Sequence, residues 1–187
     1  MNNSGKLIVF SAPSGSGKTT IIKSILKLFP EFVFSVSATT RKKREVESEG
    51  KDYFFISEEE FEEKKNAGKF VEWEKFYGYY YGTLKDFVND HLKENHTIIF
   101  ELDVKGAVKL KEVYPDAILI FISPPNIDEL KKRLKERRTE TEEDFVKRIE
   151  RAEMEMGYKD KFDHVVINSD LDSAKNSVIE IVKKEIN

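Results

Sequence analysis

The residues Ala12-Pro13-Ser14-Gly15-Ser16-Gly17-Lys18-Thr19 determine how the rest of the chain is interpreted. They follow an apolar run from Lys6 to Phe10 and precede a segment with helical apolar spacing: Ile21, Ile22, Ile25, Leu26 and Leu28. The pattern predicts a strand, a loop and a helix. Small residues let successive backbone N–H groups surround a phosphate, and the positive end of the helix dipole adds to the attraction. The stretch therefore indicates a loop that binds nucleotide phosphates.

Two residues at the end of this loop carry specific chemistry. Lys18 is expected to bridge the β- and γ-phosphates, and the hydroxyl of Thr19 is expected to ligate Mg²⁺. Ala12 replaces the first glycine of the strict motif, and its methyl group is small enough to fit. A Gly/Ser-rich turn without a ligand is the alternative, but it explains neither Lys18 nor Thr19. We expect these residues to bind ATP: Ala12, Pro13, Ser14, Gly15, Ser16, Gly17, Lys18, Thr19 and Thr20.

Three more apolar runs predict strands, each followed by a predicted helix. The strands are expected at Ile98 to Leu102, Ala117 to Ile122 and Val165 to Ile167, and the helices at Lys105 to Val113, Ile127 to Arg137 and Asp170 to Glu185. Buried strands that alternate with helices are typical of a parallel sheet covered on both faces. The fold class is therefore α/β, with a P-loop core.

Two segments depart from this alternation. Residues 32–82 suggest small strands around one helix, which Ser57 and Glu60 would cap and Gly68 would end. Thr141 and Asp144 form a second capping box, after a polar stretch typical of a lid. We expect one domain over residues 1–187, with a core of about 1–35, 84–126 and 160–187, a mixed α+β insert of about 36–83, and a helical lid of about 127–159.

Composition excludes several other classes of protein. Thirty-five acidic and 32 basic residues give a net charge of −3, so no bulk positive field favours nucleic acid. The chain has no cysteine, and its start lacks a signal-peptide pattern. Its apolar runs are too short to span a membrane. We expect a cytoplasmic protein, a monomer or homodimer, that acts on small molecules.

The chain resembles the guanylate kinase family over almost its whole length. The matching segments are Ser37-Ala38-Thr39-Thr40-Arg41, Gly50-Lys51-Asp52-Tyr53-Phe54-Phe55, Val71-Glu72-Trp73, Tyr80-Tyr81-Gly82-Thr83, Glu101-Leu102-Asp103-Val104-Lys105-Gly106, Thr139-Glu140-Thr141-Glu142 and Asn168-Ser169-Asp170. The resemblance implies that the insert binds GMP. It also implies transfer of the γ-phosphoryl group of ATP to GMP, with Mg²⁺.

The resemblance implies a GMP site of two parts. Arg41, Arg44, Tyr53 and Tyr81 would bind the phosphate, because guanidinium groups and phenol hydroxyls match its oxygens. The guanine pocket would comprise Ser37, Glu72, Thr83 and Asp103. Carboxylates accept hydrogen bonds from N1–H and the amine of guanine, and hydroxyls donate to O6.

One acidic residue after the strand at 98–102 is expected to organise Mg²⁺ through a water molecule. Glu101 and Asp103 are the candidates, and the sequence leaves the choice open. We favour Glu101 for the metal and Asp103 for guanine. His91, His96 and His164 match no motif of the family.

The resemblance also assigns residues near the transferring group. Arg133, Arg137 and Arg148 match lid and core arginines, whose charge would stabilise the transition state. Asn168 matches a position near the adenine of ATP. The chain departs from the family at Lys42-Lys43 and Glu45-Val46, which replace the usual Pro and Gly, and at Arg138, which replaces a lid glycine.

Two other functions share parts of this sequence pattern. A related kinase could phosphorylate a ribose phosphate, but it would have no need of Glu72. A guanylate-kinase-like protein-binding module that has lost catalysis typically lacks a working phosphate loop, whereas this chain keeps Lys18 and Thr19.

Overall fold

A five-stranded parallel sheet forms the centre of the molecule. The computed structural model describes residues 5–76, 78–136 and 142–186. The strand order is β2-β7-β1-β8-β9, and every pairing is parallel. In that order the strands are Val33–Phe34, Ile98–Glu101, Leu7–Ser11, Ile118–Ser123 and His164–Ile167. Central β1 pairs Val9 with Phe100 and Leu119, and all five of its residues are buried.

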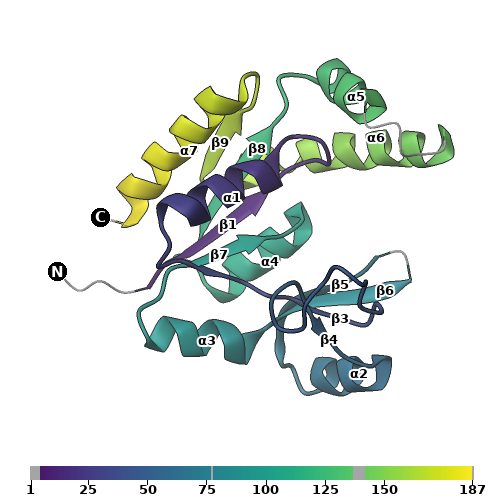
Figure 1. Cartoon of the computed structure of the whole chain (residues 1–187), viewed down its shortest axis with the longest axis vertical. Coiled ribbons are helices and arrows are strands. Elements are labelled where there is room, and N and C mark those ends of the chain that lie inside the picture. Colours follow the sequence, from purple (N-terminus) through teal and green to yellow (C-terminus); the bar gives the residue numbers. More distant parts are fainter. Residues whose placement is uncertain (1–4, 77, 137–141, 187) are drawn as a thin grey trace.

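Helices cover both faces of this sheet (Figure 1). Successive side chains of a strand point to opposite faces, so Ile8 and Phe10 pack under α1 (Lys18–Leu28) and α7 (Leu171–Ile186). Leu7 and Val9 pack under α3 (Lys85–Lys93) and α4 (Val104–Val113). The predicted parallel α/β core is therefore confirmed. The sequence did not predict β2 or α3.

A second, four-stranded sheet lies between β2 and α3 in the chain. Its order is β4-β3-β6-β5, with strands Phe54–Phe55, Ala38–Thr39, Tyr79–Leu84 and Phe70–Phe76. Helix α2 (Glu58–Asn66) covers it through Phe61, which is stacked 4.3 Å from Phe70 and 5.1 Å from Tyr80.

The predicted ends of α2 are confirmed. Ser57 Oγ accepts the N–H of Glu60 at 3.0 Å, and Gly68 follows the helix with a φ of 65°. A residue with a side chain is disfavoured at that φ, which is why glycine ends the helix.

Two helices form a small cluster above the carboxyl ends of the central strands (Figure 1). Helices α5 (Ile127–Glu136) and α6 (Glu142–Met156) pack through Leu130, Leu134, Ile149 and Ala152. The predicted capping residue Thr141 lies outside the described residues. A single 3₁₀ turn, Lys159–Lys161, leads into β9.

No helix within the described ranges is long and apolar enough to cross a membrane.

Candidate active site

The phosphate loop runs from the end of β1 to the first turn of α1, as predicted. Gly15 and Gly17 adopt φ values of 91° and 87°, which residues with side chains rarely take. A Cβ at Gly17 would lie 2.5 Å from the amide nitrogen of Asn168, and one at Gly15 would lie 3.1 Å from Leu134. The backbone conformation thus favours glycine at both positions, and close neighbours, Asn168 just after β9 and Leu134 of α5, leave little room for a side chain.

Asn168 supports this loop from behind. It is buried, and its side-chain amide donates a 2.8 Å hydrogen bond to the carbonyl of Ser16. Arg133 donates in turn to the carbonyl of Asn168 at 3.1 Å and to Glu129 at 3.0 Å. These contacts hold both residues against the loop, and neither residue lines the cavity that the loop borders.

Lys18 and Thr19 point toward the end of β7. The Lys18 ammonium donates to the carbonyl of Leu102 at 3.3 Å and lies 3.7 Å from Oε1 of Glu101. The Thr19 hydroxyl donates to that same oxygen at 2.9 Å. A hydroxyl and a carboxylate so close together form an oxygen pair of the kind that Mg²⁺ prefers.

Two cavities adjoin in front of these residues. The larger, of about 410 Å³, is lined by residues 12–20 and by side chains of α6. The smaller, of about 290 Å³, lies against the second sheet. They share four lining residues, Phe76, Glu101, Asp103 and Arg151, and therefore form one continuous site.

The smaller cavity contains most of the predicted guanine pocket. Ser37, Glu72 and Asp103 line it, and Thr83 donates a 2.7 Å hydrogen bond to Oε1 of Glu72. Glu72 is only 8% exposed, and burial raises the pKa of its carboxyl, while the Thr83 hydrogen bond opposes that shift. A Cβ at Gly106 would lie 3.1 Å from oxygens of both Glu72 and Asp103, so glycine leaves room for the two carboxylates.

Asp103 also explains why α4 begins at Val104, one residue earlier than predicted. Its Oδ1 accepts the N–H of Gly106 at 2.7 Å, as an N-cap does. Its other oxygen accepts a 3.3 Å hydrogen bond from Arg151. Both carboxylates line both cavities, but Glu101 contacts Thr19 whereas Asp103 contacts Arg151.

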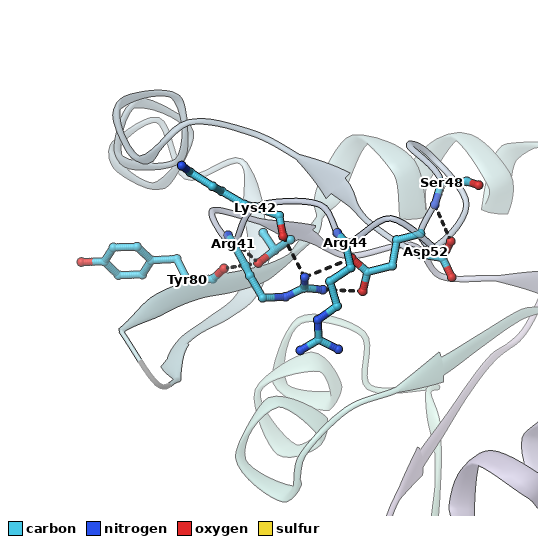
Figure 2. A network of polar contacts seen from close by, with 8 residues as sticks. Arg41, Lys42, Arg44, Ser48, Asp52 and Tyr80 are labelled. Atoms are coloured by element: carbon cyan, nitrogen blue, oxygen red, sulfur yellow. Dashed lines mark hydrogen bonds and ion pairs between the residues drawn. The ribbon is translucent and has the colours of Figure 1, made fainter.

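Arg41 is held by a residue that the sequence analysis missed. Its guanidinium donates two hydrogen bonds to Glu47, at 2.7 and 3.0 Å, and Glu47 also accepts the N–H of Arg44 at 2.8 Å (Figure 2). The side chains of Arg41 and Glu47 are 13% and 12% exposed, so water screens this pair little. The guanidinium lowers the pKa of Glu47 to about 2.

Aromatic side chains connect Arg41 to the smaller cavity. The guanidinium lies 5.4 Å from the ring centre of Tyr53, which packs edge-on against Tyr81 at 5.9 Å. Both tyrosines line that cavity. In Figure 2 the Arg44 side chain extends away from the segment of residues 41–48. Of the four predicted phosphate ligands, the structure thus brings Arg41, Tyr53 and Tyr81 together.

Of the predicted lid arginines, Arg148 faces the phosphate loop. It lines the larger cavity and lies 3.5 Å from Oγ of Ser14. Arg137 lies outside the described residues.

Arg151 is a further site residue that the sequence analysis missed. It pairs with Glu155 at 2.9 Å and Asp103 at 3.3 Å, and its guanidinium lies 4.4 Å from the ring centre of Phe76. Glu74 lies nearby, and burial together with the Asp103 carboxylate raises the pKa of its carboxyl to about 7. The spacing could have identified it, because Arg151 follows Arg148 by three residues and the two therefore lie on one face of the helix.

Comparisons with known proteins agree with this geometry. The family model described as guanylate kinase matches residues 4–185. A guanylate kinase of Thermotoga maritima is 44% identical over 97% of this chain and 87% of its own length. One of Chlorobaculum tepidum is 48% identical over 93% and 90%. The crystal structure of guanylate kinase from Anaplasma phagocytophilum aligns with a TM-score of 0.75 and 28% identity, over 99% of this chain and 88% of that one.

Proposed function

The chain belongs to the guanylate kinase family, and we propose how its residues share the family's reaction. It is an ATP:GMP phosphotransferase, which converts ATP and GMP into ADP and GDP. The two adjoining cavities carry the proposal, because direct transfer needs the donor and acceptor phosphates to meet across a common wall. The larger cavity takes ATP and the smaller takes GMP.

Residues 12–20 bind the phosphates of ATP. Backbone N–H groups surround the β-phosphate, and the ammonium of Lys18 leaves the carbonyl of Leu102 to bridge the β- and γ-phosphates. Asn168 contributes by holding the loop, as its bond to Ser16 and its proximity to Gly17 support.

The residues present suit Mg²⁺. Thr19 would ligate the ion directly and Glu101 through a water molecule, as the 2.9 Å contact between their oxygens supports. When bound, Mg²⁺ neutralises charge on the transferring phosphoryl group. Asp103 is then assigned to the nucleobase, in keeping with its position beside Glu72, since a Cβ at Gly106 would touch oxygens of both carboxylates.

GMP is recognised at both ends. Glu72 and Asp103 accept hydrogen bonds from the N1–H and amine of guanine, and Ser37 and Thr83 supply hydroxyls. Arg41, Arg44, Tyr53 and Tyr81 hold the GMP phosphate. Glu47 is a positioning residue, because its two hydrogen bonds fix the Arg41 guanidinium before GMP arrives.

The α5–α6 pair closes over the reaction. Arg148 and Arg137 stabilise charge on the transferring group as its bond to the ADP oxygen breaks and its bond to a GMP phosphate oxygen forms. Arg133 acts beside the loop through its contact with Asn168. Arg151 connects α6 to the GMP-binding cavity through its hydrogen bond to Asp103. Closure excludes water, which would otherwise accept the phosphoryl group.

The buried Glu72 favours this function over transfer to a ribose phosphate, since such an acceptor offers no ring N–H donor. The test is ADP release with GMP, AMP, UMP, CMP and ribose bisphosphate as acceptors. GMP should be preferred by orders of magnitude. Equal or faster transfer to the ribose bisphosphate would refute the assignment of the smaller cavity, and no transfer to any acceptor would favour the protein-binding module. The cytoplasmic location and the monomeric or homodimeric state stay predictions.

A further inference from the structure

Two of the three histidines of the chain meet at the carboxyl end of α3. Nδ1 of His91 lies 3.1 Å from Nδ1 of His96. Oε2 of Glu94 lies 3.8 Å from the first nitrogen and 3.3 Å from the second. These residues line neither of the two cavities described above, so the proposed transfer reaction does not account for them.

A backbone motif brings the three side chains together. Helix α3 ends at Lys93, and Asn95 follows with a φ of 60°. The N–H of His96 then bonds to the carbonyl of His91 at 2.9 Å, and that of Asn95 bonds to Leu92 at 3.0 Å. This is the Schellman pattern, in which the positions of His91 and His96 commonly hold an apolar pair. Here two imidazoles occupy those positions, with a carboxylate beside them.

The ring of His91 also packs against an aromatic side chain. Phe87, one turn earlier on α3, packs edge-on against it with the ring centres 4.5 Å apart. Phe87 in turn packs edge-on against Phe54 of the second sheet, with the ring centres 6.3 Å apart. Backbone and aromatic contacts thus hold the cluster.

The three distances match the edges of a metal coordination shell. Ligand atoms about 2.0–2.1 Å from a tetrahedral zinc ion lie about 3.3 Å from one another. The observed separations of 3.1, 3.3 and 3.8 Å surround that value. Without a metal, one Nδ1 must carry a proton that the other accepts, and a metal ion would replace that proton.

We propose that His91, Glu94 and His96 bind one first-row divalent transition-metal ion, with Nδ1, Oε2 and Nδ1 as ligands and water in the fourth position. Imidazole and carboxylate suit ions such as Zn²⁺, whereas Mg²⁺ prefers oxygen ligands alone. The site therefore discriminates against the ion that serves ATP. By joining the last turn of α3 to the segment before β7, the bound ion stabilises the folded chain.

The experiment is a Zn²⁺ titration of the full chain in excess Mg²⁺, by competition with a chromogenic chelator, together with thermal unfolding. The wild type should bind one equivalent that resists Mg²⁺, and its Tm should rise with Zn²⁺. His96→Gln and Glu94→Gln should each weaken Zn²⁺ binding by about tenfold or more and reduce the rise in Tm. GMP phosphorylation without Zn²⁺ should be unchanged in both variants.

His164→Gln is the matched control, because it removes the third histidine, which pairs with Glu185 at 2.9 Å. It should leave Zn²⁺ binding intact. The proposal fails if the wild type binds no stoichiometric Zn²⁺, if His96→Gln keeps full affinity, or if His164→Gln loses as much. Glu94 is 65% exposed and His96 41%, against 28% for His91, so the two chosen variants are the ones expected to fold normally.

Discussion

Replacing Glu72 with glutamine is the most direct test of whether the smaller cavity recognises guanine. The two side chains have the same shape, and the amide oxygen can still accept the 2.7 Å hydrogen bond from Thr83. What changes is the atom that faces guanine, because an NH₂ donor replaces an acceptor. GMP then loses one hydrogen bond to a charged group, worth about 1.5–3 kcal/mol, and its own donor is left unpaired against the new NH₂ group, at a further cost of about 1–3 kcal/mol.

The combined loss of about 2.5–6 kcal/mol corresponds to a fall of about 10² to 10⁴ in kcat/KM for GMP. AMP should lose little, since its unprotonated N1 accepts from the new amide. The ratio of GMP to AMP should therefore collapse. ATP binding at the phosphate loop should not change.

Stability should move differently from activity. Burial raises the pKa of Glu72, so the native state holds its proton more tightly than the unfolded chain does. The stability that this proton contributes is lost as pH rises through the native pKa. Glutamine has no charge to bury, and Tm at neutral pH should stay level or rise.

The assay measures kcat/KM for GMP and AMP, ATP affinity and Tm in the wild type and Glu72→Gln. Glu62→Gln is the matched control, because Glu62 pairs with Lys65 outside both cavities. A GMP-to-AMP ratio that survives in Glu72→Gln would refute the reasoning and leave guanine recognition to Asp103, Ser37 and Thr83. Activity and Tm falling together would show damage to the fold instead.

Four other changes test the rest of the site. Lys18→Met should lower kcat by about 10³ or more with Tm unchanged, and a loss under about tenfold would remove Lys18 from the chemistry. Arg148→Ala should depress kcat far more than equilibrium GMP binding, whereas normal turnover at saturation with poor binding would place it elsewhere. Glu47→Gln should raise KM for GMP by roughly tenfold to a hundredfold while kcat stays within a few-fold, because Arg41 loses its orientation; an unchanged KM contradicts that role. Glu74→Gln should flatten the fall in stability between pH 4.5 and about 7, as the raised pKa requires, and an identical pH profile in denaturant unfolding would count against it.

Local patterns predicted most of the core. The apolar runs predicted β1, β7, β8 and β9 because strands buried in a parallel sheet need continuous apolar sequence. Ser57 and Gly68 marked the ends of α2 because capping acts within one turn. Strand β2 has only two residues, and α3 buries only Val88 completely, so neither presented a strong pattern.

The site needed contacts that no local pattern contains. Glu47 is one of many charged residues in the sequence, and only the folded conformation of residues 41–47 brings it to Arg41. Arg151 stands among the basic and acidic side chains of α6, and its contact with Asp103 spans 48 residues. The choice between Glu101 and Asp103 likewise depends on contacts between distant residues, to Thr19 for Glu101 and to Arg151 for Asp103.

The support that Asn168 gives the phosphate loop bears on how the protein is made. The loop emerges from the ribosome early, but the side chain that bonds to Ser16 and fills the space beside Gly17 is synthesised about 150 residues later. At about 5–20 residues per second, the growing chain carries an unsupported loop for roughly 8–30 seconds. During that interval the nascent protein lacks the contact between Asn168 and Ser16. We therefore expect nucleotide binding to begin near the end of translation, because a fragment that stops before β9 keeps the motif but lacks the contact of Asn168 with Ser16.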